Sequence, residues 1–251
     1  MTCVLGIDIG TTSTIAILID VSGQVLAQAS RPVTFSSPQQ GWAEENPEQW
    51  WGNVCALVPE ILTTAKLPAT AIRAVGVTGM LPATVLLDKQ GKLLRPSIQQ
   101  SDGRTGAQVR EIAAEIPENQ FIAKAGNGIN QQLIASRLRW IEKHEPTVFA
   151  RIATVFGSYD FINWRLTGVR AIEQNWALEA GFVDIATNEL SPELIALAHV
   201  PLEEIPPKVA SHAVLGKINA EAAKATGLAE GTLVVGGAAD HIASAYAAGI
   251  H

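Results

Sequence analysis

The chain has 251 residues, of which 47% are apolar and 17% are charged, and its formal net charge is −6. This composition excludes a disordered chain and argues against nucleic acid or another polyanion as a partner, because the balance of charge is acidic. No run reaches the roughly 20 apolar residues of a membrane span, and the two cysteines fit no disulfide or metal pattern, so we expect no membrane partner and a reducing, cytoplasmic location.

The first elements of the chain are predicted to be strands joined by tight turns. An apolar run at residues 4–9 contains a single carboxylate, Asp8, and a turn at residues 10–12 leads to a β-branched run at 15–19. A further turn precedes an extended run at 25–30. Because no helical spacing follows the glycine turn, the pattern predicts a hairpin and not the strand-to-helix loop of a dinucleotide fold.

This hairpin turn is a candidate phosphate-binding loop. Gly10 would let the backbone approach a polyphosphate, Thr11 and Thr12 offer amides and hydroxyls, and Asp8 could hold Mg²⁺ through water. The alternative interpretation is an ordinary β-hairpin with a threonine-rich turn.

The next elements define the fold class. Asn46 as N-cap and Pro47 as the first helical residue begin a predicted helix, and residues 72–78 return to the sheet. Three antiparallel strands followed by a crossover helix predict an α/β, ribonuclease H-like domain with a mixed sheet flanked by helices. A doubly wound Rossmann sheet is the alternative, and the consecutive hairpins argue against it.

Three motifs carry a resemblance to a known family. They are Gly-Trp-Ala-Glu-Glu-Asn-Pro-Glu at 41–48, Arg-Leu-Thr-Gly at 165–168 and Val-Val-Gly-Gly-Ala-Ala-Asp at 234–240. In this order they resemble the FGGY carbohydrate kinases of the actin-like ATPase superfamily. The resemblance implies that residues 1–251 form the N-terminal domain, which binds the sugar and carries the catalytic base, that ATP and Mg²⁺ are used, and that the C-terminal nucleotide-binding domain is absent.

The resemblance also suggests residues for a sugar pocket. Gly79 and Met80, together with Asp102 and Arg104, are similar to two parts of the pocket in xylulose-type kinases, whereas Leu81 departs from the common histidine. The identity of the sugar therefore stays open. Asp102 could instead cap the helix that follows it, and Arg104 could be a solvated surface group.

Residues 119–150 are predicted to be helical, and we interpret Arg137 and Arg139 there as part of a solvated charged face.

A second candidate part of the sugar site follows a predicted helix that ends at Gly168. Asn175 and Trp176 would offer amide and indole donors that suit sugar hydroxyls. Glu173 departs from the aspartate-serine-alanine pattern of the family, and its role stays open.

Asp240 is the candidate catalytic residue. A buried strand at 231–235 runs into the small-residue turn 236–239, and Asp240 then opens a predicted helix at 241–248. The local alternative is an ordinary helix cap. The matching family position is the base that accepts a proton from the substrate hydroxyl.

Together these features predict ATP-dependent phosphorylation of a sugar or polyol, with a ketopentose such as xylulose as the expected substrate. The alternative is a nucleotide-gated regulatory or binding protein of the same superfamily. Because the chain stops soon after Asp240, we expect an excised domain that is inactive alone, with an apolar patch that could support a homodimer.

Overall fold

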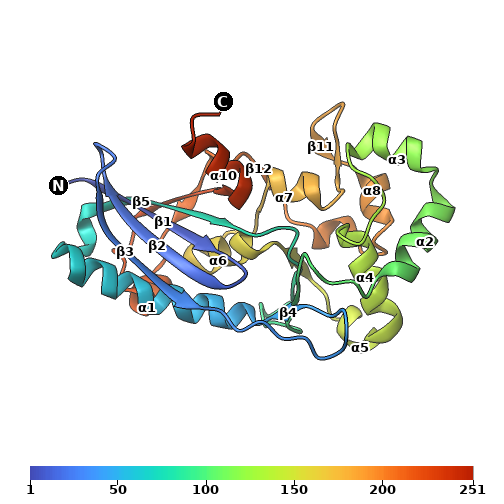
Figure 1. Ribbon diagram of the computed structural model, residues 1–251, viewed down its shortest axis with the longest axis horizontal. Coiled ribbons are helices and arrows are strands. Elements are labelled where there is room, and N and C mark those ends of the chain that lie inside the picture. Colours follow the sequence, from blue (N-terminus) through green and yellow to red (C-terminus); the bar gives the residue numbers. More distant parts are fainter. Residues whose placement is uncertain (251) are drawn as a thin grey trace.

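A mixed sheet organises the protein, and it occupies one half of the molecule in Figure 1. The computed structural model describes residues 1–250, within which seven strands follow the order β13-β14-β5-β1-β2-β3 with β15 beside β5. Their bounds are β1 (Cys3–Ile9), β2 (Ser13–Asp20), β3 (Val25–Pro32), β5 (Ile72–Gly79), β13 (Val214–Lys217), β14 (Leu233–Val235) and β15 (Ala238–Ala239). Strands β1, β2 and β3 are antiparallel neighbours, and β5 lies parallel to β1, which confirms the predicted α/β class and strand directions.

One face of this sheet is covered by helices. Alternate residues of β1, such as Leu5 and Ile9, are buried on this side. Helix α1 (Pro47–Ala65) packs on β2 and β3, and it also contacts α6 (Ser158–Thr167) and α9 (Ala220–Thr226). The start of α1 confirms the predicted cap, since the Asn46 side chain accepts a hydrogen bond from the Glu48 amide at 3.0 Å.

On the other side of the sheet, helix α10 (Asp240–Ala247) contacts β15 and β5. Figure 1 shows this last helix above the sheet and α1 below it. The sheet is therefore flanked by helices on both faces, but α10 covers only part of its face, because Ile15 and Ile17 remain partly exposed there.

The other half of the molecule consists of short elements. Its helices are α2 (Gly106–Glu115), α3 (Glu118–Ala125), α4 (Ile134–His144), α5 (Pro146–Phe149), α7 (Gln174–Glu179) and α8 (Pro192–Ala196), with 3₁₀ turns at Ala69–Ala71 and Leu202–Glu204 elsewhere. Its strand pairs are β4 (Glu44–Glu45) with β7 (Ser97–Ile98), β6 (Val85–Leu87) with β8 (Thr154–Phe156), β9 (Ile172–Glu173) with β12 (Lys208–Val209), and β10 (Val183–Asp184) with β11 (Glu189–Leu190). None of the helices within residues 1–250 combines the length and hydropathy of a membrane span.

The interpretation of α4 as a solvated charged helix is wrong. The stretch 119–150 is divided into three helices, and Arg137 and Arg139 on α4 are both buried. Arg139 pairs with Glu115 of α2, and Arg137 points into the interior. The two arginines suggested a solvated face because the sequence does not reveal their acceptors. These acceptors lie on distant segments, and many of them are backbone carbonyls.

Candidate functional site

The candidate site lies where parallel strands end at one edge of the sheet. Thr78 of β5 pairs with Asp8 of β1 on one side and with Ala238 of β15 on the other. Asp240 follows immediately after β15. Two strand spacings therefore separate Asp8 from Ala238, which places the backbone of Ala238, two residues before Asp240, roughly 10 Å from that of Asp8.

Asp8 has a free oxygen that could meet a cation or its water. Its Oδ1 is buried and has no hydrogen-bond partner within residues 1–250, and the same is true of Thr78 Oγ1 on the neighbouring strand. Burial, and secondarily the negative charge of Asp240, raise the pKa of Asp8 to about 6. An orphaned carboxylate oxygen fits the oxygen ligands that Mg²⁺ prefers. The described residues contain no cluster of three or more acidic, histidine or cysteine ligands, so Asp8 could supply only part of the coordination.

The turn between β1 and β2 matches the predicted hairpin. The Gly10 amide donates to the Ser13 carbonyl at 3.0 Å, so this amide serves the turn itself. Thr11 and Thr12 are exposed, and the Thr11 hydroxyl lies 3.5 Å from the sulfur of Met80. The Gly10 amide is thus occupied by the turn itself, while Thr11 and Thr12 are exposed to a ligand.

Gly79 and Met80 lie beside this turn. The Met80 amide donates to the Ile9 carbonyl at 3.0 Å, and the Ser158 hydroxyl donates to the Met80 carbonyl at 2.7 Å. A Cβ atom on Gly79 would lie 2.7 Å from Ser158 Oγ, so only glycine fits between β1 and α6. The structure therefore brings Gly79 and Met80 together with Thr11 and Asp8.

The turn before Asp240 is fixed by steric fit and hydrogen bonds. Gly237 has φ +85°, and a Cβ atom there would lie 1.9 Å from the Val77 carbonyl oxygen. The Gly237 amide donates to the Ser211 carbonyl at 3.0 Å. Asp240 is the first residue of α10 and not its N-cap, which is Ala239. Its side chain is 46% exposed, so the carboxylate is open to a substrate.

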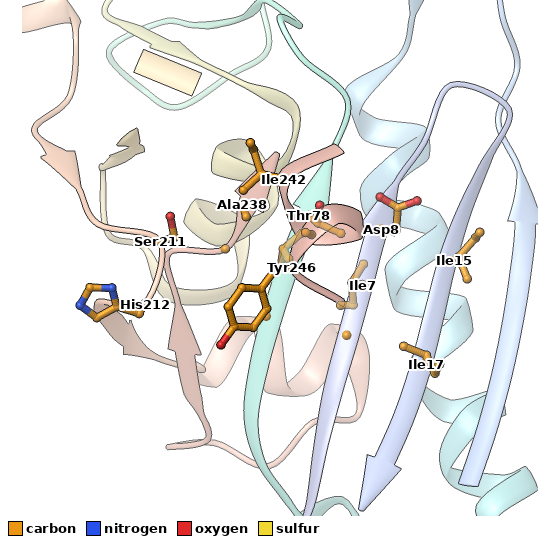
Figure 2. A pocket seen from close by; sticks show the side chains of 15 residues that line it. Ile7, Asp8, Ile15, Ile17, Thr78, Ser211, His212, Ala238, Ile242 and Tyr246 are labelled. Carbon is orange, nitrogen blue, oxygen red and sulfur yellow. The ribbon is translucent and has the colours of Figure 1, made fainter. Parts of the chain in front are cut away.

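A cavity of about 700 Å³ lies between α10 and the uncovered face of the sheet, as Figure 2 shows. Asp8 and Thr78 supply polar groups to this cavity, while Ile15, Ile17 and Ile242 make much of the remaining wall apolar. Asp8 thus lines a largely apolar hollow, whose other wall is formed in part by α10, the helix that begins at Asp240.

Asp102 and Arg104 lie in the other half of the molecule, where they form a buried pair. Asp102 Oδ2 accepts hydrogen bonds from the Ala43 amide at 2.6 Å and from Arg104 Nη2 at 2.7 Å. The Arg104 guanidinium stacks on Trp42, with 3.8 Å between its Cζ and the ring centroid, and it also lies over Trp140 at 4.9 Å. The alternative of a solvated Arg104 is wrong, because its side chain is 1% exposed.

The other alternative for Asp102 is also wrong. The N-cap of α2 is Thr105, and Asp102 accepts instead from the Arg104 amide, at 3.0 Å. A second hollow, of about 790 Å³, lies beside this segment and is lined partly by the amide side chains of Gln100, Asn130 and Gln131.

Glu173 organises the second predicted part of the sugar site. Its carboxylate accepts hydrogen bonds from Tyr159 Oη at 2.8 Å, Ser211 Oγ at 2.6 Å, and the Asn175 amide and Nδ2 at 2.8 Å each. Burial raises the pKa of Glu173, and these hydrogen bonds oppose the shift. Trp176 is fully buried, and its indole nitrogen donates to the Ala83 carbonyl at 3.1 Å. The donors expected from Asn175 and Trp176 are therefore already engaged within the protein.

Sequence reasoning missed two residues near these segments. Thr78 could have been found, because it is a polar residue directly before Gly79 in an otherwise apolar strand. Arg137 gave no such signal, since its position relative to the loops depends on the tertiary packing of α4.

Comparison with known proteins identifies the family. The family model described as "FGGY family of carbohydrate kinases, N-terminal domain" matches residues 3–247. The xylulose kinase of Escherichia coli K12 is 30% identical over 98% of this chain and 50% of its own length, and the L-xylulose/3-keto-L-gulonate kinase of the same organism is 32% identical with the same coverage. The crystal structure of xylulose kinase from Rhodospirillum rubrum matches with a TM-score of 0.95 and 56% identity, over 99% of this chain and 52% of that one.

These comparisons confirm the resemblance seen in the three sequence motifs and the mixed α/β fold. The chain spans about half the length of the relatives that it matches. The match of this family model to residues 3–247 shows that the chain belongs to the FGGY family of carbohydrate kinases, in the part of that family described as its N-terminal domain.

Proposed function

We propose that this chain is the sugar-binding and catalytic-base domain of a kinase that transfers a phosphoryl group from ATP to a hydroxyl of a sugar or polyol. The observation that carries the proposal is the placement of Asp8 and Asp240 at one edge of the sheet, with Gly79 and Met80 between them and Thr11 beside Met80. A ketopentose such as xylulose is the proposed substrate, because several relatives are named xylulose kinases.

Each residue has a defined task in this proposal. The open carboxylate of Asp240 accepts the proton of the attacking hydroxyl, which is the one proton transfer that phosphoryl transfer to an alcohol requires. Thr11 and Thr12 hold phosphate oxygens with their hydroxyls, and Asp8 would hold Mg²⁺ through water. The bound Mg²⁺ would neutralise charge on the phosphates. Gly79 and Met80 contact the sugar and orient its reacting hydroxyl.

The proposed partner of this domain is a C-terminal domain, because the chain matches only about half the length of its relatives. The groups that bind adenosine would belong to a C-terminal domain in the other half of the full-length protein, so this chain alone would hold a nucleotide mainly by its phosphates. We therefore propose that residues 1–251 fold as one domain and show negligible kinase activity when isolated. A cytoplasmic location fits the free Cys3 and Cys55, and homodimer formation through the apolar cavity region stays a prediction.

The test is an assay of the full-length protein with MgATP and a panel of ketopentoses, polyols and aldonates. We expect ADP release that depends on one of these sugars and a phosphorylated product. ATP hydrolysis that no sugar changes would instead support a nucleotide-gated regulatory protein, and the absence of both activities would refute the kinase proposal.

A further inference from the structure

Helix α4 places a cation entirely inside the protein. The Arg137 side chain is fully buried, and its Nη1 donates to the carbonyl of Pro82, to Thr84 Oγ1 at 3.1 Å and to the Ile98 carbonyl at 3.1 Å. Its Nη2 donates to the Gln99 carbonyl at 3.1 Å. One guanidinium thus binds two separate segments of the chain, the loop 80–84 after β5 and the segment 97–104 that contains β7.

Both segments carry candidate sugar-site residues. The loop 80–84 begins at Met80, whose sulfur contacts the hydroxyl of Thr11 in the candidate phosphate-binding loop at residues 10–12. The segment 97–104 ends at Asp102 and Arg104, and the Asp102 amide donates to the same Gln99 carbonyl that Arg137 binds. Arg137 therefore shares the Gln99 carbonyl with the Asp102 amide on one side, and on the other it binds the Pro82 carbonyl, two residues after Met80.

Few other bonds join the two segments directly. The Thr84 amide donates to the Ile98 carbonyl at 3.2 Å, as an isolated bridge between them. Other contacts tie each segment to a different element: Trp176 of α7 binds the Ala83 carbonyl, and the Gln99 amide donates to Ala43. The relative position of the two segments thus depends strongly on Arg137.

The chemistry of this residue suits positioning better than stability. Burial lowers the pKa of Arg137 to about 9, and the charge of Asp102 opposes this shift. A buried cation carries a desolvation penalty that an apolar side chain of similar volume would avoid, so stability alone gives no reason for an arginine here. The donors of its planar fork are spread over three nitrogens and reach acceptors on separate segments, whereas the three donors of a lysine ammonium all leave from one nitrogen.

We infer that Arg137 is a positioning residue, which fixes the loop 80–84 against the segment 97–104 and so sets the affinity of the site for its sugar. The inference rests on the proposed function in one respect, the assignment of these two segments to a sugar site. Helix α4 is suited to this role, because Trp140, one turn after Arg137, packs on Arg104 of the same segment.

The test compares Arg137→Lys and Arg137→Met with the wild-type chain. Arg139→Lys is the matched control, because Arg139 lies on the same helix and binds Glu115 of α2 and the Leu197 carbonyl. Backbone amide exchange is measured by segment, together with the affinity for each sugar of the panel by calorimetry. We expect both Arg137 variants to speed exchange within 80–84 and 97–104, to leave β1 and β2 protected, and to weaken sugar binding by about tenfold.

The outcomes separate this inference from the proposed function. Arg137→Lys with wild-type exchange in both segments would overturn the inference, as would faster exchange spread evenly over the sheet. Unchanged sugar affinity in a variant whose loops exchange faster would also overturn it, while the kinase proposal would stand. A wild-type chain that binds no sugar of the panel, alone or as part of the full-length protein, would refute the sugar site itself. If Arg137→Met does not fold, the charge-conserving Arg137→Lys carries the comparison.

Discussion

The carboxylate of Asp8 lies in the electrostatic field of Asp240, whose negative charge adds to burial in raising the pKa of Asp8 to about 6. Like charges at one edge of a sheet disfavour each other's ionised form unless a cation lies with them. This relationship links the two groups that we assign to different steps, and they are tested separately.

Asp240→Asn should lower the proposed kinase turnover of the full-length protein by about 10² or more, with little change in sugar affinity. Asparagine keeps the size of the side chain but cannot accept the proton of the hydroxyl. Steady-state kinetics and sugar titration measure the two quantities, and Asp20→Asn, in a distant exposed turn, serves as the control. Near-normal turnover in Asp240→Asn would refute the base assignment.

Asp8→Ala should raise the Mg²⁺ concentration that full-length activity requires, because it removes the buried Oδ1, which has no hydrogen-bond partner within residues 1–250. Sugar binding to the isolated chain should be preserved. The measurement is activity against Mg²⁺ concentration, with calorimetry for the sugar. An unchanged metal requirement would assign Asp8 a structural role.

Gly237→Ala should destabilise the chain by about 3 kcal/mol or more, because its new Cβ would lie 1.9 Å from the Val77 carbonyl oxygen. Gly231→Ala is a matched control, since Gly231 also has positive φ but has nothing within 4 Å of its Cβ position. We expect that variant to lose only about 1 kcal/mol. Chemical unfolding measures the destabilisation of both variants. Equal losses of stability would show that the positive φ, and not the close approach to β5, is the reason why position 237 requires glycine.

Glu45→Gln should change how stability depends on pH. Burial raises the pKa of Glu45 to about 7, against the opposing hydrogen bond from Trp50 Nε1 at 2.9 Å. A raised carboxyl pKa contributes stability that is fully present below about pH 4.5 and is lost as pH rises through about 7. Glutamine still accepts from Trp50 but does not titrate, so the loss of stability between pH 5 and 8 should shrink by on the order of 1 kcal/mol after solvent screening. Unfolding curves at several pH values test this, and an unchanged pH dependence would contradict it.

The parts of the fold that follow local rules were predictable from the sequence. The three antiparallel strands and the Asn46 cap with Pro47 after it appear as expected, because each depends on neighbours within a few residues. The emergence of Asp240 from a glycine turn was predictable for the same reason.

The walls of the site were not predictable in this way. Arg137 binds carbonyls between 38 and 55 residues away along the chain, and Trp176 binds a carbonyl 93 residues away. A donor whose acceptor lies on a distant backbone has no sequence signature. The side chains that looked free for a ligand were therefore those that tertiary packing had already engaged.

The pairing of β1, β5 and β15 has a consequence for how the full-length enzyme could work. Because β5 pairs with β1 at Asp8 and with β15 two residues before Asp240, strand pairing, and not a long loop, largely sets the spacing of the two carboxylates. If the proposed C-terminal domain closes on this one, it would deliver the nucleotide to a pair of carboxylates already in place. Mutations that alter turnover by changing this spacing should then be found in the strand ladder and in the Gly237 turn, and not in exposed loops far from the site.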